Sequence, residues 1–307
     1  MPYSRRRPTT SRRARRRYTP RSTRRYSAKT RPYRRTTRTR RSMMSSKRIL
    51  NLTARKKRDT MLCVSNTTPT TPSGSTSYNA QPAVLNAGGV YIFPWICTWR
   101  DNGGSGTIYD DAVRSSTTCF MKGLKEKINL VSNDGTQWLW RRVCFTMKGG
   151  DFYGLTSAGY SLAIQNAFGF QRLVNDINNA GSSGQTLRTE ILNVIFRGGN
   201  TVDWNNIFTA PMNTTRVTVK YDKTTSLSSG NAAGKNMVFN RWHPMNKNLV
   251  YEDDEDGTET NPGAASTSGK AGMGDYYVLD FFQSGPAASS GSQLAFSPEA
   301  TIYWHEK

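Results

Sequence analysis

The sequence predicts an all-β protein, an eight-stranded antiparallel jelly roll of two packed sheets with long loops and a disordered, Arg-rich N-terminal arm. Three observations support this prediction. The first 58 residues contain 24 Lys or Arg and no Asp or Glu, whereas residues 59–307 contain 19 basic and 21 acidic residues. In the second part, short runs rich in aromatic and β-branched residues alternate with Gly, Ser, Thr and Asn. Turn signals such as Asn102-Gly103-Gly104 separate these runs.

Residues 1–48 form the predicted arm, and residues 49–307 form the folded domain. The arm has almost no aliphatic side chain, so burial cannot offset the entropy lost on ordering it. Its arginines suit phosphate, and its interleaved tyrosines can stack on unpaired bases. This composition favours single-stranded nucleic acid as the ligand over a merely solubilising role. The predicted phosphate-binding residues of the arm are Arg5, Arg6, Arg7, Arg12, Arg13, Arg15, Arg16, Arg17, Arg21, Arg24, Arg25, Arg34, Arg35, Arg40 and Arg41.

A second basic cluster consists of Arg55, Lys56, Lys57 and Arg58. We expect it to contribute to nucleic-acid binding, and a short basic cluster is also typical of a nuclear-localisation signal. The alternative is that these are simply the last basic residues before the fold. Both interpretations stay open at this point.

Eight strand-like runs follow the arm. Apolar and polar residues alternate most clearly from Arg216 to Tyr221, as in a half-buried strand. Residues 187–196 are apolar on both faces, which predicts a central strand. Short helices are predicted at residues 157–166 and 203–208, and long irregular insertions after Ser65, Gly149 and Ser226. The eight predicted strands are residues 59–64, 90–98, 117–131, 138–147, 187–196, 214–221, 275–282 and 300–304.

Composition also bears on the cellular compartment. No apolar stretch approaches the roughly 20 residues of a membrane span, and arginines stand where a signal peptide has its apolar core. We therefore expect neither membrane association nor secretion. The four cysteines are far apart and include no C-x-x-C pair, which predicts buried thiols in a reducing compartment rather than a disulfide or metal framework. They are Cys63, Cys97, Cys119 and Cys144.

Enzyme motifs fail at specific residues. Residues 230–236 resemble a phosphate-binding loop, but Asn236 replaces the Ser or Thr that binds magnesium, and the two glycines are one residue too close. His243 and His305 are the two histidines, and neither has a second histidine at metal-ligand spacing. The sequence therefore predicts no catalytic residue, no cofactor and no well-defined metal site.

One concentration of carboxylates, the acidic run, consists of Glu252, Asp253, Asp254, Glu255 and Asp256. It does not fit an EF-hand loop, because the Glu expected at position 263 is Gly. Three interpretations remain. The run is a solvated loop, it pairs with basic residues of a neighbouring subunit, or it forms a cation site between subunits.

Four blocks of sequence, in order, point to a known family. They are KKRDTML at 56–62, TTCFMKGL at 117–124, WRRVCFT at 140–146 and WHPMNKNLVY at 242–251. From about Lys56 to the C-terminus the chain resembles the capsid proteins of genomoviruses, the small circular single-stranded DNA viruses typified by gemycircularviruses. The resemblance implies a jelly-roll subunit, a T=1 icosahedral shell of about sixty copies, and a circular single-stranded DNA genome inside.

The expected function is therefore that of a structural capsid protein, present in the virion and, during assembly, in the host nucleus. Its expected partners are further copies of itself, the single-stranded DNA genome and nuclear import receptors. The competing class is a DNA-condensing protein whose basic arm is joined to a β domain that never assembles. A third class is a sugar-binding or hydrolytic jelly roll with a basic targeting arm.

Overall fold

A computed structural model describes residues 44–71, 77–102, 110–149, 152, 160–178, 182–257, 259–261 and 263–307. The arginines predicted to bind phosphate between Arg5 and Arg41 therefore lie outside the described residues. The chain divides into two units, residues 1–44 and residues 45–307. The second unit opens with helix α1 (Ser46–Thr53), which is capped by the Ser45 side chain. Regular structure thus begins at Ser46, three residues before position 49, where the sequence predicted the start of the folded domain.

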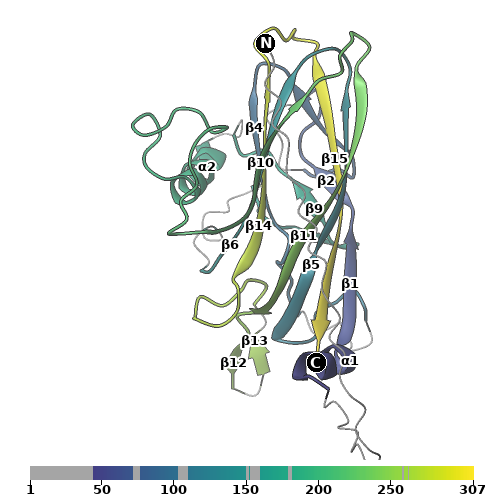
Figure 1. Ribbon diagram of the computed structural model, residues 1–307, viewed down its shortest axis with the longest axis vertical. Coiled ribbons are helices and arrows are strands. Elements are labelled where there is room, and N and C mark those ends of the chain that lie inside the picture. The colour runs from purple at the N-terminus through teal and green to yellow at the C-terminus, as the bar shows by residue number, and fades with distance from the viewer. Residues whose placement is uncertain are drawn as a thin grey trace, which may run out of the picture. The chain divides into compact units, whose positions relative to one another are not determined.

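Two antiparallel sheets form the body (Figure 1). The first sheet has the order β1 (Arg55–Met61), β15 (Gln293–Glu306), β5 (Thr118–Ser132) and β11 (Lys235–Val250), and β3 (Ala83–Asn86) also pairs with β15. The second has the order β10 (Thr218–Leu227), β6 (Trp138–Met147), β14 (Asp275–Ser284) and β4 (Val90–Ile96). Three small pairs complete the β structure: β2 (Cys63–Ser65) with β9 (Arg172–Val174), β7 (Gln165–Asn166) with β8 (Gly169–Phe170), and β12 (Asp254–Asp256) with β13 (Glu259–Asn261).

The main core lies between the two sheets. Burial alternates residue by residue along β15, so one face of that strand meets the core and the other meets solvent. Aromatic rings join the sheets: Phe296 of β15 lies 4.9 Å from Phe282 of β14 and 5.9 Å from Phe93 of β4. The prediction of a β-rich body with two antiparallel sheets is confirmed, and the body is mostly β rather than all-β, because it also contains helix α1 and a second helix, α2 (Ser182–Ile195).

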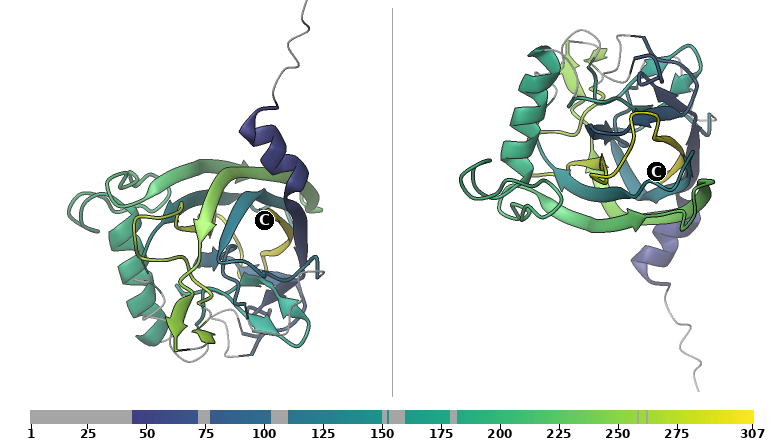
Figure 2. Two further views of the ribbon diagram at one scale, coloured as in Figure 1. Left: turned by 90° about the horizontal axis from the view of Figure 1, so that it is seen from below. Right: turned by 90° about the horizontal axis from the view of Figure 1, so that it is seen from above.

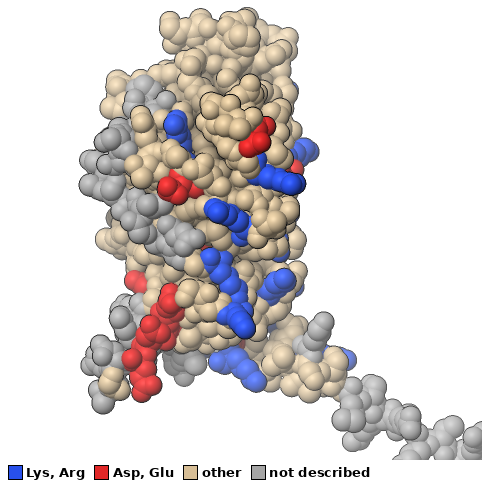
Figure 3. All heavy atoms as spheres, turned by 90° about the vertical axis from the view of Figure 1, so that its left-hand side faces the viewer, with Lys and Arg blue, Asp and Glu red and all other residues tan. Residues whose placement is uncertain are grey.

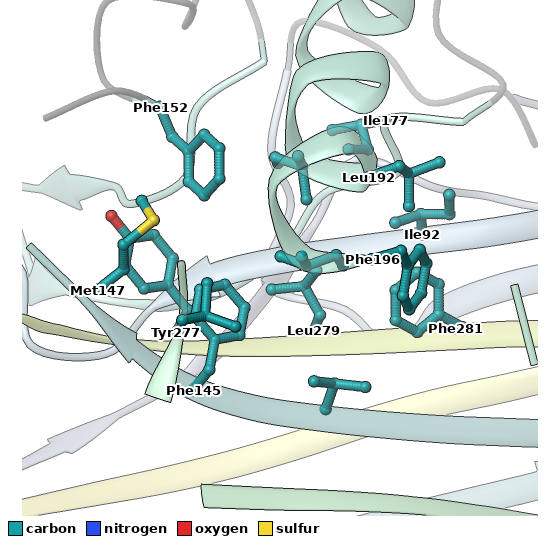
Figure 4. Close-up of a cluster of buried hydrophobic side chains, with 14 of the residues drawn as sticks. Ile92, Phe145, Met147, Phe152, Ile177, Leu192, Phe196, Tyr277, Leu279 and Phe281 are labelled. Atoms are coloured by element: carbon teal, nitrogen blue, oxygen red, sulfur yellow. The ribbon is translucent and has the colours of Figure 1, made fainter. Parts of the chain in front are cut away.

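Three strands of the second sheet, β4, β6 and β14, are buried on both faces, because helix α2 packs on their outer side (Figures 2 and 4). Leu187, Ile191 and Ile195 recur at a spacing of four along α2 and are buried against the sheet. The prediction of a central strand at residues 187–196 is therefore wrong. A short run that is apolar all round cannot be assigned to strand or helix by periodicity alone, and a helix of 14 residues fits it here.

Other predicted elements also differ from the structure. Residues 203–208 form turns rather than the predicted helix. Of the helix predicted at residues 157–166, the described residues 160–166 form loop and short strand segments instead. The 16-residue strand β11 lies where an irregular insertion was expected, because its polar and charged outward side chains hide the alternation. The first strand begins at Arg55 rather than Asp59, since its register against β15 extends through the whole basic cluster.

All four cysteines are buried and free, as predicted. Burial raises the pKa of Cys63 to about 12, so this thiol stays protonated near neutral pH. Within the described ranges, the helices are too short or too polar to cross a membrane.

Candidate nucleic-acid interface

The basic cluster at residues 55–58 is part of β1, so its side chains alternate between solvent and core. Lys56 and Arg58 are exposed. Lys57 points inward, pairs with Glu306 at 3.0 Å, and donates a hydrogen bond of 2.7 Å to the Val113 carbonyl. The Lys57 ammonium is therefore used inside the fold and does not reach a phosphate from this position. Arg55 is partly buried.

Three more lysines continue the positive charge across the same side of the first sheet. Lys122, Lys125 and Lys127 project from β5 to solvent, while the intervening Leu124, Glu126 and Ile128 point inward. Among the described residues of the four main strands of this sheet, Glu299 is the one exposed carboxylate. We call this surface the basic sheet face, comprising Lys56, Arg58, Lys122, Lys125 and Lys127.

Exposed and partly exposed aromatic rings lie among these cations. Trp242 of β11 is 48% exposed, and its ring centroid lies 5.9 Å from that of Tyr303 on β15, across the intervening strand β5. Gly123 of β5 makes this contact possible, because a Cβ there would come within 2.6 Å of the Trp242 ring. A second pair, Phe120 and His305, has its centroids 5.9 Å apart.

Positive charges outnumber negative charges on the basic sheet face. Partial burial, followed by the charges of Lys56 and Lys122, lowers the pKa of His305. The imidazole is thus neutral at pH 7 in the unbound protein. Proteins that bind single strands without sequence preference combine two features. Their cations neutralise phosphates, and nearby aromatic rings stack on unpaired bases. The face can serve that chemistry.

The basic sheet face beyond β1 was not predicted from the sequence. The signal was present, because Lys125 and Lys127 alternate with apolar or inward-facing residues in the predicted strand 117–131. Trp242 and Tyr303 could not have been paired from the sequence, since they lie on strands separated in the sheet by β5.

The structure divides the acidic run rather than giving its residues one role. The Asp253 side chain is buried, and Arg114 donates hydrogen bonds of 2.6 and 3.0 Å to its two carboxylate oxygens. Burial opposes ionisation of Asp253, but Arg114 holds its pKa below the usual value. Glu252, Asp254 and Glu255 are exposed, and the backbone of residues 254–256 pairs with β13.

Asp253 is therefore neither solvated nor available to a neighbouring subunit. Arg114 is itself fully buried, stacks 4.0 Å from the centre of the Tyr251 ring and donates 2.9 Å to the Gly263 carbonyl. A Cβ at Gly263 would lie 2.0 Å from the Glu252 carbonyl oxygen, so glycine is required for this approach. For the exposed carboxylates, all three interpretations remain proposals.

A third group has the residue types of a catalytic triad but lacks the required reactivity. Cys144 Sγ lies 3.8 Å from His243 Nδ1, and His243 Nε2 lies 3.5 Å from Glu126 Oε2. All three residues are buried. Burial raises the pKa of Cys144 far above its ordinary value, so the thiolate needed for nucleophilic attack is not formed.

The body is thus a two-sheet β protein with one helix-covered sheet and one basic, aromatic face. No family model matches the chain, and no curated protein matches it either.

Proposed function

We propose that the protein is a viral capsid subunit with a jelly-roll fold that packages single-stranded DNA. The order of the strands carries this proposal. When the eight long strands β1, β4, β5, β6, β10, β11, β14 and β15 are renumbered 1 to 8 along the chain, the two sheets read 1-8-3-6 and 5-4-7-2. Two four-stranded sheets that exchange strands in this way correspond to two Greek keys, the arrangement of jelly rolls in capsid and lectin domains.

The DNA-binding part of the proposal rests on charge. Residues 1–41 contain 18 Lys or Arg. In a shell of about sixty copies these would contribute roughly 1,000 positive charges, enough to neutralise a similar number of phosphates. Contacts of this kind carry no base information, so binding is largely independent of sequence. The basic sheet face adds stacking surfaces to that charge.

The same basic segments would direct the protein to the nucleus, where the resembled viruses replicate. Because Lys57 is buried in β1, the signal is assigned mainly to the arm rather than to residues 55–58 as a linear motif. A fluorescent fusion with the arm arginines neutralised is expected to stay cytoplasmic, whereas neutralising Lys56 and Arg58 alone leaves nuclear entry intact.

Negative-stain electron microscopy of the purified full-length protein tests the main proposal. The expected result is a population of closed particles of one size that contain DNA. Dispersed monomers or irregular aggregates with DNA would contradict it and favour a nucleic-acid-condensing protein. Glycan binding without particles would favour the sugar-binding class of jelly roll.

A further inference from the structure

A groove of about 400 Å³ lies on the body. It is formed by the end of β6, the start of β10, part of β11 and the segment before β14. Among its described lining residues are four cations and no carboxylate; the cations are Lys148, Arg216, Lys220 and Lys247. Figure 3 shows Lys and Arg side chains gathered in a row down one side of the molecule, beside a group of acidic side chains.

Two irregularities in the strands bring lysines to this groove. Lys220 is the extra residue of a bulge in β10, because Val219 lies opposite Phe145 and Tyr221 lies opposite the next residue, Cys144. The register of β11 also shifts, between Pro244 and Lys247. Bulges redirect side chains and are frequent next to functional sites. Here the bulges in the two edge strands β10 and β11 place Lys220 and Lys247 in the lining of the same groove.

Asn246, in the β11 bulge, has a positive φ of 49°, an uncommon conformation for a residue other than glycine. Gly272 forms the opposite wall with a φ of 74°, and a Cβ at Gly272 would lie 2.8 Å from the Val250 backbone nitrogen. The wall can therefore approach β11 this closely only with glycine at position 272. The groove is built by specific local geometry rather than left by loose packing.

The cations of the groove lack counter-charges. Within the described part of the chain, Arg216, Lys220 and Lys247 form no ion pair, and Lys148 donates to backbone carbonyls, including that of Gly269 at 2.9 Å. Partial burial, followed by repulsion from Lys247, lowers the pKa of Lys220. A bound anion would relieve the repulsion and replace the water that these ammonium groups lose.

We propose that this groove is an oxyanion site that binds a phosphate group of a nucleic-acid backbone, with Lys220 and Lys247 as its principal ligands. The described part of the lining contains no Trp, Tyr or Phe, so it suits a phosphate rather than a base. The site also adjoins the basic sheet face, because Lys122 donates 3.0 Å to the side chain of Asn246, the residue before Lys247. A strand crossing that face would reach the groove at the edge of the sheet.

The oxyanion site stands on its own geometry, and only the nucleic-acid source of the phosphate rests on the proposed function. Thermal unfolding of the full-length protein separates the two. A ligand raises the unfolding temperature only if it binds the folded state in preference to the unfolded state. Because the variants compared all carry the same arm, a difference between them reports binding by the body.

Lys220→Met is the test variant, and Lys223→Met is its control, because Lys223 is exposed on the same strand but does not line the groove. Inorganic phosphate at roughly ten times its Kd is expected to raise the unfolding temperature of the wild type and of Lys223→Met by about 3 °C over chloride of equal ionic strength. Lys220→Met is expected to lose this rise. An equal rise in all three proteins, or no rise in the wild type, would overturn the oxyanion site.

A ten-residue oligo(dT) tests the source of the phosphate in the same assay. We expect Lys220→Met, but not Lys223→Met, to lose part of the stabilisation that the oligonucleotide gives. If only inorganic phosphate depends on Lys220, the nucleic-acid source is wrong. If phosphate has no effect and Lys220→Met instead prevents particle formation, the groove receives carboxylates of a second copy. Absence of particles in every variant contradicts the capsid proposal but not the site.

Discussion

Arg142 of β6 and Glu126 of β5 form a fully buried ion pair that joins the two sheets, with 2.5 Å between Nη1 and Oε2. Arg142 also makes two hydrogen bonds of 2.7 Å to Asp280 of β14. Arg172 of β9 bonds both carboxylates, at 3.1 Å to Glu126 and 3.0 Å to Asp280. Two arginines and two carboxylates thus neutralise one another within the core, where an unpaired charge would be very costly.

Replacing Arg142 by Met is expected to destabilise the body by about 3–5 kcal/mol, because it leaves buried carboxylates without their partner. Urea unfolding followed by tryptophan fluorescence measures this change. Lys127→Met is the control, since Lys127 is exposed on β5 and its replacement is expected to change stability little. A loss of less than about 1 kcal/mol for Arg142→Met would show that the network relaxes or hydrates.

The network also predicts how stability depends on pH. Burial acts to raise the pKa of Glu126, but Arg142 and Arg172 outweigh it and hold that pKa well below the usual value of 4.5. Its stabilising contribution is therefore complete above pH 4.5 and is lost as the pH falls toward the folded-state pKa. Urea titrations between pH 6 and pH 2 should show the stability difference between wild type and Glu126→Gln shrinking in that acid range. A constant difference would contradict this assignment.

Asp253 and Asp254 are adjacent but are expected to behave differently. Asp253→Asn weakens the bidentate pair with buried Arg114 and is expected to cost about 2 kcal/mol of stability. Asp254→Asn, at an exposed position, is expected to leave the melting temperature nearly unchanged. Calorimetry of both variants checks this. Equal melting temperatures would return Asp253 to the status of a solvated side chain.

Trp242 is expected to contribute to single-strand binding through stacking. Trp242→Ala should weaken binding of oligo(dT) by about tenfold, within the 1–3 kcal/mol typical of one base–aromatic stack. Duplex binding should change little, because paired bases offer no free face. Fluorescence anisotropy at raised salt, where the contribution of the arm is reduced, measures both affinities. Val238→Ala is the matched control, since Val238 is 54% exposed on the same strand. Equal losses on both substrates would reduce Trp242 to a structural role.

Removal of residues 1–41 takes away 18 basic residues and none of the strands of the body. The shortened protein is expected to fold, and the particles that it forms are expected to lack DNA. The ratio of absorbance at 260 to 280 nm measures their nucleic-acid content, with full-length particles as the reference. Particles filled to the normal level would show that packaging depends on the body alone.

The sequence predicted those strands whose side chains alternate or whose apolar residues cluster, including β4, β5, β6 and β14. It failed where one pattern suits two structures, as in α2, and where polar residues occupy the outward positions of a long strand, as in β11. The role of Lys57 was hidden because its partner, Glu306, lies almost at the other end of the chain. The groove could not be predicted either, because one-residue bulges in two different strands bring Lys220 and Lys247 together, and the sequence pattern does not reveal such bulges.

Helix α2 has a consequence for the symmetry of the sandwich. It covers the outer side of one sheet with apolar contacts, while the outer side of the other sheet stays open, charged and aromatic. The two broad surfaces of the subunit are therefore chemically unequal before any partner binds. In the proposed shell, this inequality would let each subunit present its basic sheet face to the packaged polyanion.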